Sequence, residues 1–125
     1  GVAPQVQMTG DVSTANNGGF IQIRRDVSTL TMKNISGVYL TVKGNGEKYF
    51  VHIRTKWTVL PWQYYQAEFA TSDQWRETRL SFGEFNGSSW LLPKNISGGD
   101  IRSIGIVAFG RDHAADISVR EIGFF

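Results

Sequence analysis

The sequence predicts an all-β protein, an antiparallel β-sandwich of jelly-roll type. About eight segments alternate between apolar and polar residues, which is the period of a strand with one buried face. Glycines and asparagines separate these segments, and none carries the apolar i, i+3, i+4, i+7 stripe of an amphipathic helix. Because 125 residues is an ordinary size for one domain, residues 1–125 are expected to form a single β-sandwich domain.

Most of the expected strands are short alternating segments. They are Val6–Val12, Phe20–Arg24, Val38–Lys43, Tyr49–Arg54, Tyr64–Phe69, Ile101–Phe109 and Ile117–Phe124. The turn sequence Asn16–Gly19 predicts a hairpin between the first two strands. The turn sequence Gly44–Gly46 predicts a second hairpin between the next two. Loops are expected at Lys56–Gln63, Asn86–Asp100 and Arg111–Asp116.

Alternate residues of the middle strands are expected to point into the core between the two sheets. They are Val38, Leu40, Val42, Tyr49, Val51, Ile53, Tyr65, Ala67, Phe69, Ile104, Ile106 and Ala108.

The stretch from Trp75 to Phe85 is expected to be a further strand that runs into a tight corner. It carries four large apolar side chains, and burying each one contributes roughly 1.5–3 kcal/mol. Gly83 lies where the alternation breaks, which suits a bend. Trp75 is expected to fill the centre of the core, so this stretch has an architectural role.

Composition excludes several classes of function. The absence of cysteine rules out disulfides, thiolate catalysis and cysteine-based zinc sites. The formal net charge of +2 is too small to indicate nucleic-acid binding. No apolar run approaches the roughly 18 residues that predict a membrane span. No signal peptide is visible, and the compartment stays open.

Several short strings occur in an order that is similar to one known family. They are Asn16–Phe20, Val38–Gly46, Tyr65–Phe69, the Trp75–Phe85 stretch, Ile101–Gly105 and Ile117–Ile122. Together they resemble the complex I intermediate-associated protein 30 family. The resemblance implies a galactose-binding-domain-like jelly roll and a binding or assembly role without catalysis. Eukaryotic relatives assist the assembly of respiratory complex I, which implies a protein partner and a mitochondrial or bacterial location.

Family members usually begin with a further strand, whereas about fifteen residues precede Asn16 here. The chain therefore resembles a domain that lacks its N-terminal strand segment. An edge strand left unpaired in this way favours a homodimer through backbone pairing. A second, looser similarity is to family 11 carbohydrate-binding modules, which implies carbohydrate as the alternative ligand.

One strand face is a candidate ligand site. His52 and Arg54 point the same way along their strand. If this strand pairs with Tyr64–Phe69, then Tyr64, Gln66 and Glu68 share that face. Aromatic rings and planar polar side chains are typical of sugar sites. The alternative is an ordinary solvated sheet face with an Arg54–Glu68 ion pair.

Two tryptophans, Trp57 and Trp62, flank Pro61 in one expected loop. Exposed aromatic residues on a loop often mark a contact surface. The alternative is that both fold back as a lid over the edge of the sandwich, since tryptophan is usually largely buried. A carbohydrate module would place these rings with Tyr64 along an open groove, whereas an assembly module would present a flatter apolar patch.

Asp112, His113 and Asp116 lie close together in an expected loop. The carboxylates of Asp112 and Asp116 predict a structural calcium site, with a solvated turn as the alternative. No other cofactor is expected.

An enzymatic role is not expected. A catalytic triad would need His52 or His113, and no Gly-x-Ser-x-Gly elbow is present. A glycosidase pair would need two glutamates, and most of these lie at strand ends or on exposed faces.

Overall fold

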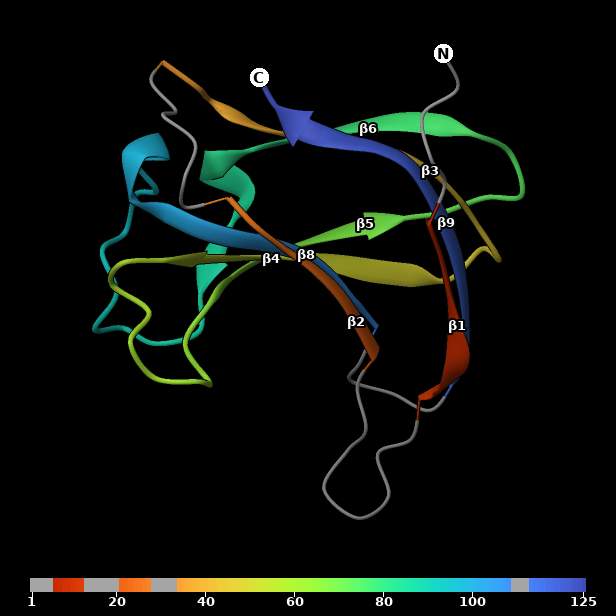
Figure 1. Cartoon of the computed structure of the whole chain (residues 1–125), viewed down its shortest axis with the longest axis horizontal. Helices are drawn as coiled ribbons and strands as arrows, with labels where there is room; N and C mark the ends of the chain where they lie inside the picture. The colour runs from red at the N-terminus through yellow and green to blue at the C-terminus, as the bar shows by residue number, and fades with distance from the viewer. Residues whose placement is uncertain (1–5, 13–20, 28–33, 109–112) are drawn as a thin grey trace.

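The computed structural model describes residues 6–12, 21–27, 34–108 and 113–125 of the chain, and these form two antiparallel sheets (Figure 1). The strands are β1 (Val6–Val12), β2 (Ile21–Asp26), β3 (Gly37–Gly44), β4 (Lys48–Thr55), β5 (Tyr65–Ala70), β6 (Arg76–Ser81), β7 (Asn86–Gly87), β8 (Ile101–Ala108) and β9 (His113–Phe124). Two 3-10 helices, Phe82–Glu84 and Gly98–Asp100, are the helices of the described residues, and neither is long enough to cross a membrane.

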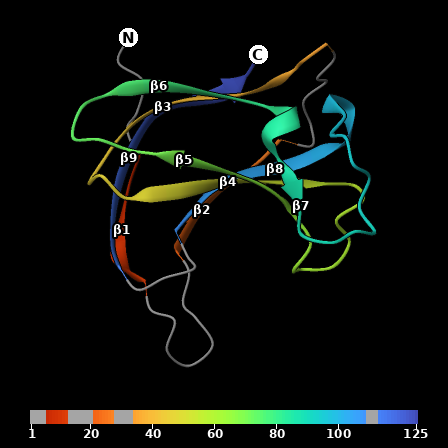
Figure 2. The same cartoon turned by 180° about the vertical axis from the view of Figure 1, so that it is seen from behind.

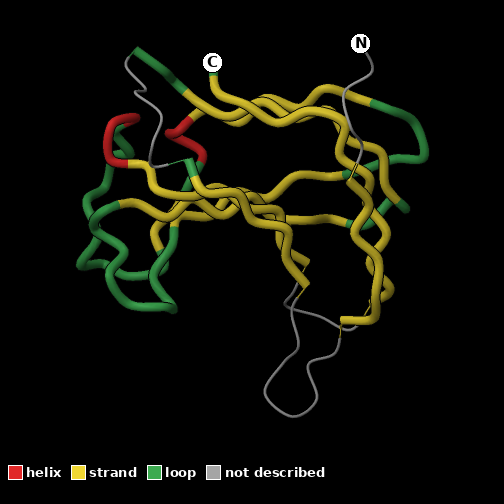
Figure 3. The backbone as a smooth tube through the Cα atoms, viewed as in Figure 1, coloured by secondary structure: helices red, strands yellow, loops and turns green. Residues whose placement is uncertain are grey.

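One sheet has the strand order β1-β9-β3-β6 and the other has the order β2-β8-β4-β5-β7, with every pair antiparallel. The two sheets are seen from opposite sides in Figures 1 and 2, and strands dominate the tube in Figure 3. The prediction of an all-β antiparallel sandwich of jelly-roll type is confirmed.

The core lies between the inner faces of the two sheets, as the alternation of apolar residues predicts. Each of the twelve residues expected to point inward is buried. Tyr49 of β4 and Tyr65 of β5 are the largest fully buried side chains among the described residues. The phenol of Tyr49 donates to Oδ1 of Asn45 and accepts from the backbone N–H of Asp116 on β9. This pair of hydrogen bonds connects the two sheets.

Both predicted hairpins are wrong. β1 pairs with β9, whereas β2 pairs with β8 in the opposite sheet. Likewise, β3 and β4 lie in different sheets on either side of the Gly44–Gly46 turn. The period of two identifies the buried face of a strand but not its neighbour, and in a jelly roll a turn can carry the chain from one sheet to the other. The Asn16–Gly19 turn lies outside the described residues.

The predicted central position of Trp75 is also wrong. Trp75 lies just before β6, is only partly buried, and stacks against Arg120, whose guanidinium carbon is 4.1 Å from the ring centroid. The register of β3 and β9 shifts at Arg120. In the rest of the stretch, Leu80 and Phe85 are buried as predicted, Phe82 is partly buried against the core, and the 3-10 helix makes the bend at Gly83.

The last strand is longer than predicted. It begins at His113, so Asp116 lies within β9 and not in a loop.

At the edges of the four-stranded sheet are β1 and β6. Arg76, Glu77 and Arg79 place charges along β6, and charged edges oppose pairing with another chain. The homodimer stays a prediction.

Candidate functional site

A slot crosses the outer face of the five-stranded sheet at Gly105 of β8. In the register of the sheet, Gly105 pairs with Arg24 of β2 on one side and with His52 of β4 on the other. Adjacent strands are about 4.8 Å apart, so β2 and β4 are separated by about 10 Å across β8. Because glycine has no side chain, the space between the side chains of Arg24 and His52 stays open.

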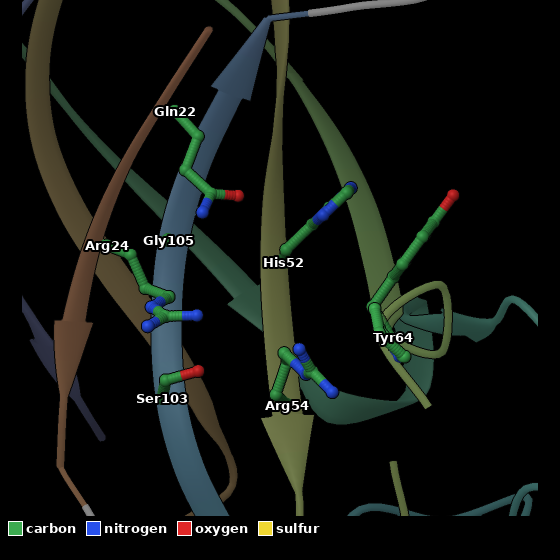
Figure 4. A pocket seen from close by; sticks show the side chains of 8 residues that line it. Gln22, Arg24, His52, Arg54, Tyr64, Ser103 and Gly105 are labelled. Atoms are coloured by element: carbon green, nitrogen blue, oxygen red, sulfur yellow. The ribbon is translucent and has the colours of Figure 1, made fainter. Parts of the chain in front are cut away.

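The slot has a volume of about 130 Å³. Its lining residues are Gln22, Arg24, His52, Arg54, Pro61, Tyr64, Ser103 and Gly105. Figure 4 shows Gln22 and Arg24 reaching over β8, with His52 and Arg54 on the β4 side. Pockets for drug-sized ligands have volumes of roughly 300–1,000 Å³, so this slot accommodates one small chemical group.

One wall of the slot is made by two stacked rings. The rings of His52 and Tyr64 lie 4.1 Å apart between centroids and are inclined by 11°. Nε2 of His52 lies 2.9 Å from Oε1 of Gln66. Burial lowers the pKa of His52 below its ordinary value of 6.5, and the hydrogen bond to Gln66 opposes this effect only in part. His52 is therefore neutral at pH 7, and this wall is flat and uncharged.

Arg54 is fixed by the loop that follows β4. Its Nη2 donates to the carbonyl oxygen of Thr58 at 2.7 Å and to that of Leu60 at 3.0 Å. Thr58 is buried, and its hydroxyl hydrogen-bonds with the backbone N–H and carbonyl of Thr55. The guanidinium of Arg54 is thus held in place before any ligand binds.

The structure brings most of the predicted polar face together. β4 pairs with β5 as expected, and His52, Arg54, Tyr64 and Gln66 gather around the slot. Glu68 is farther along β5, and its Oε1 lies 3.6 Å from Nζ of Lys48. The alternative Arg54–Glu68 ion pair is wrong, because the register places Glu68 opposite Phe50, four residues along β4 from Arg54. Ligand binding by this face stays a prediction.

A second surface consists of six large apolar side chains, which we call the apolar loop patch. They are Trp57, Val59, Leu60, Trp62, Trp90 and Leu91, with exposed fractions of 50%, 76%, 40%, 66%, 91% and 66%. Among the described residues these are the exposed large hydrophobic side chains, and all lie in residues 56–64 or 88–97. In both Figures 1 and 2 these two loops lie side by side at one end of the sandwich.

Hydrogen bonds hold the two loops together. The hydroxyl of Ser88 accepts from the backbone N–H of Tyr64 and donates to the carbonyl of Trp62. The backbone N–H of Ser88 donates to the carbonyl of Tyr64 at 2.8 Å. Buried Gln63 accepts from the backbone N–H of Leu60. The apolar side chains are therefore displayed on a braced framework.

Charges are sparse around the patch. Residues 57–64 contain no charged side chain, and residues 85–99 contain only Lys94. At the margin, Lys56 forms an ion pair with Asp100 at 3.2 Å, and Nε1 of Trp57 donates to the same carboxylate. Trp90 also lines a shallow hollow of about 560 Å³. A partner that covers this surface would therefore leave few charges buried without a partner.

The two tryptophans of the first loop are exposed, so the alternative in which they form a lid is wrong for Trp62 and only partly right for Trp57. Tyr64 and Pro61 of this loop line the slot, but neither tryptophan does.

Sequence reasoning missed five slot residues, namely Gln22, Arg24, Pro61, Ser103 and Gly105. The incorrect hairpin placed β2 beside β1, which removed Gln22 and Arg24 from this face. Gly105 carried a usable signal, because it alternates with inward Ile104 and Ile106, and a glycine on the outer face of a strand marks a hollow or a close approach. Trp90 and Leu91 lie in the expected Asn86–Asp100 loop, and nothing in the sequence assigned them to a surface.

The calcium prediction stays a prediction. Asp112 lies outside the described residues. Oδ1 of Asp116 accepts from Nε2 of Gln7 at 2.9 Å. Within residues 6–12, 21–27, 34–108 and 113–125, no group of three or more His, Asp or Glu side chains could hold a metal ion.

The fold is similar to that of two solved structures from Clostridium thermocellum. One is a family 11 carbohydrate-binding module in complex with a β-1,3-1,4-mixed-linked tetrasaccharide, with a TM-score of 0.66, 13% identity, and coverage of 97% of this chain and 83% of that chain. The other is the family 11 module of the cellulosomal cellulase Lic26A-Cel5E, with a TM-score of 0.63, 12% identity, and coverage of 97% and 82%. At these identities the likeness concerns the fold alone.

None of the curated proteins compared with the chain matches it significantly. Residues 2–119 match the family described as complex I intermediate-associated protein 30. This match spans most of the 125 residues and agrees with the resemblance carried by the ordered strings. The chain therefore belongs to the complex I intermediate-associated protein 30 family.

Proposed function

We propose that this domain is a non-catalytic binding module that contacts a protein of a complex-assembly intermediate through the apolar loop patch. The observation that carries the proposal is the gathering of six exposed large apolar side chains on two neighbouring loops. Single exposed apolar residues are ordinary, whereas a contiguous exposed patch marks an interaction surface. The family description supports complex I, or an intermediate of it, as the source of the partner.

The composition of the patch resembles the centre of a protein interface. Such centres are enriched in tryptophan and depleted of charge, and a few buried aromatic side chains carry most of the binding energy. Trp62 and Trp90 are the best candidates for these anchors because they are large and highly exposed. The braced loops reduce the entropy that binding would remove.

The separation of the tryptophans from the slot also supports a protein partner. A carbohydrate module would be expected to line one groove with Trp57, Trp62 and Tyr64, yet the slot contains only Tyr64 of these three. An exposed apolar surface outside a groove suits another protein better than a chain of hydroxylated sugar rings. The proposal carries an expected location in bacteria or mitochondria, where complex I is assembled.

The test is affinity capture from detergent-solubilised respiratory membranes. The wild-type chain is expected to enrich complex I subunits, as measured by quantitative mass spectrometry. The double variant Trp62→Ala/Trp90→Ala should reduce this enrichment at least about tenfold, since truncating one interface anchor typically costs about 2 kcal/mol or more.

Trp75→Ala is the matched control, because Trp75 is also a partly exposed tryptophan but stacks on Arg120 of the four-stranded sheet, whereas the two loops connect strands of the five-stranded sheet. It should capture as much as the wild type. Equal capture by the double variant, or an absence of complex I subunits from the wild-type sample, would contradict the proposal.

A second candidate function is carbohydrate binding at the slot. It is favoured by the stacked rings of His52 and Tyr64 beside the amides of Gln22 and Gln66. One similarly folded module is described in complex with a mixed-linked tetrasaccharide, which makes that neutral sugar a suitable probe.

A further inference from the structure

We infer that the slot over Gly105 binds an anionic group, a carboxylate or a phosphate carried by a small molecule. The slot shares none of its lining residues with the apolar loop patch, so the inference does not depend on a protein partner. It concerns the same slot as the second candidate function but names an anionic group, and not a neutral sugar, as the ligand.

The charge of the lining residues points to an anion. Arg24 and Arg54 line the slot, no carboxylate among the described residues does, and His52 is neutral at pH 7. A neighbouring hollow shares Arg24 and Arg54 and adds Arg102, together with one carboxylate from Asp26. Positive charge in a partly enclosed hollow raises the local concentration of anions.

The carboxylate of Asp26 neutralises Arg24 only weakly. Its Oδ1 lies 3.9 Å from Nε of Arg24, and the two side chains are 77% and 49% exposed. Such exposed pairs contribute roughly 0–1 kcal/mol. The guanidinium of Arg24 can therefore exchange this contact for a ligand.

The second arginine is held ready for the same ligand. Arg54 uses Nη2, and more weakly Nε, to contact Thr58 and Leu60, and Nη1 makes no hydrogen bond to any described residue. Guanidinium groups recognise carboxylate and phosphate oxygens through paired, charge-assisted hydrogen bonds. The hydroxyl of Ser103 and the amide of Gln22 supply neutral donors beside them.

The floor of the slot sets the size of the ligand. A Cβ atom at Gly105 would lie 2.9 Å from the carbonyl oxygen of Ile23, so any larger residue is disfavoured there. A side chain at this position would also fill the space that a ligand would occupy. The volume of about 130 Å³ suits one charged group with a few attached atoms.

The experiment is an amide NMR titration of the full chain at constant ionic strength. The probes are sodium glucuronate, inorganic phosphate, glucose and the neutral mixed-linked tetrasaccharide. Saturable shifts at Arg24, His52 and Gly105 are expected with glucuronate or phosphate, and the responding probe distinguishes carboxylate from phosphate. Glucose should cause no saturable shift.

Two variants should change the affinity in opposite directions. Arg24→Gln should weaken binding by about tenfold to a hundredfold, the usual effect of losing a hydrogen bond to a charged group. Asp26→Asn should tighten binding by about two- to fivefold, because it removes the competing carboxylate. Arg76→Gln on the other sheet makes the same charge change as Arg24→Gln and should have no effect.

The two variants are expected to change the affinity in opposite directions. A folding defect could weaken binding but could not tighten it, so it cannot explain both results. No response to either anion, or unchanged binding in both slot variants, would overturn the inference. A response to the neutral tetrasaccharide alone would overturn it while supporting carbohydrate binding, and it would leave the protein-partner proposal untouched.

Discussion

Replacing Tyr49 with alanine is expected to lower the free energy of unfolding by about 3–5 kcal/mol, the usual cost of removing a large buried aromatic side chain. Tyr49 is completely buried, and its hydroxyl connects Asn45 to the backbone N–H of Asp116 on the opposite sheet. Domains of this size are stable by only about 5–15 kcal/mol. Urea denaturation should therefore show the variant unfolded over much of the range in which the wild type is folded.

Two further variants separate the contributions to this loss. Tyr49→Phe keeps the ring and should cost about 1–3 kcal/mol, because the hydrogen-bonding groups that meet the hydroxyl lose their partner. Trp75→Ala should cost no more than about 1 kcal/mol, since its ring is partly exposed and stacked on Arg120. A larger loss for Trp75→Ala than for Tyr49→Ala would show that the core has been placed wrongly.

Gly37→Ala is expected to destabilise the domain by about 3 kcal/mol, near the upper end of typical overpacking costs. A Cβ atom there would lie 2.4 Å from the carbonyl oxygen of Leu80 and 2.8 Å from Cα of Ser81. Both contacts are with the backbone of the neighbouring strand β6, which has no flexible side chain to move aside. The clash would loosen the pairing of β3 with β6.

The matched control is Gly99→Ala, where the added methyl group meets nothing within 4 Å. Its denaturation midpoint should stay close to that of the wild type, within about 0.5 kcal/mol. Equal midpoints for the two alanine variants would mean that β3 and β6 do not approach as closely as described.

The fold could be predicted because alternation reports burial directly. Tyr49, Val51 and Ile53 in one strand, and Tyr65 and Phe69 in the next, point inward as their spacing requires. Strand pairing is a different kind of information. It depends on which sheet each strand joins, and turn residues such as Gly44–Gly46 serve a crossing between sheets as well as a hairpin.

Hydrophobicity alone also misplaced one side chain. Trp75 was expected in the centre because it is large, but the sandwich is filled by Tyr49 and Tyr65, whose hydroxyl groups find partners at the edges of the core. Trp75 instead stacks on Arg120 at a point where the strand register shifts.

The candidate surfaces were predictable to different extents. The β4–β5 half of the slot followed from alternation, because His52, Arg54 and Gln66 share one face. The β2 half required knowledge of long-range pairing and was missed. Exposure of Trp57 and Trp62 could not be decided from sequence, since an aromatic loop can fold inward or outward with the same composition.

Site-specific photo-crosslinking tests the central claim, the role of the apolar loop patch, most directly. A photoreactive amino acid is placed at Trp62, at Trp90 or, as the control, at Trp75, and each protein is irradiated with solubilised respiratory membranes. The positions of Trp62 and Trp90 should crosslink to a complex I subunit, identified by mass spectrometry, and the position of Trp75 should not. Crosslinks to that subunit from Trp75 alone, or from none of the three positions, would contradict the claim.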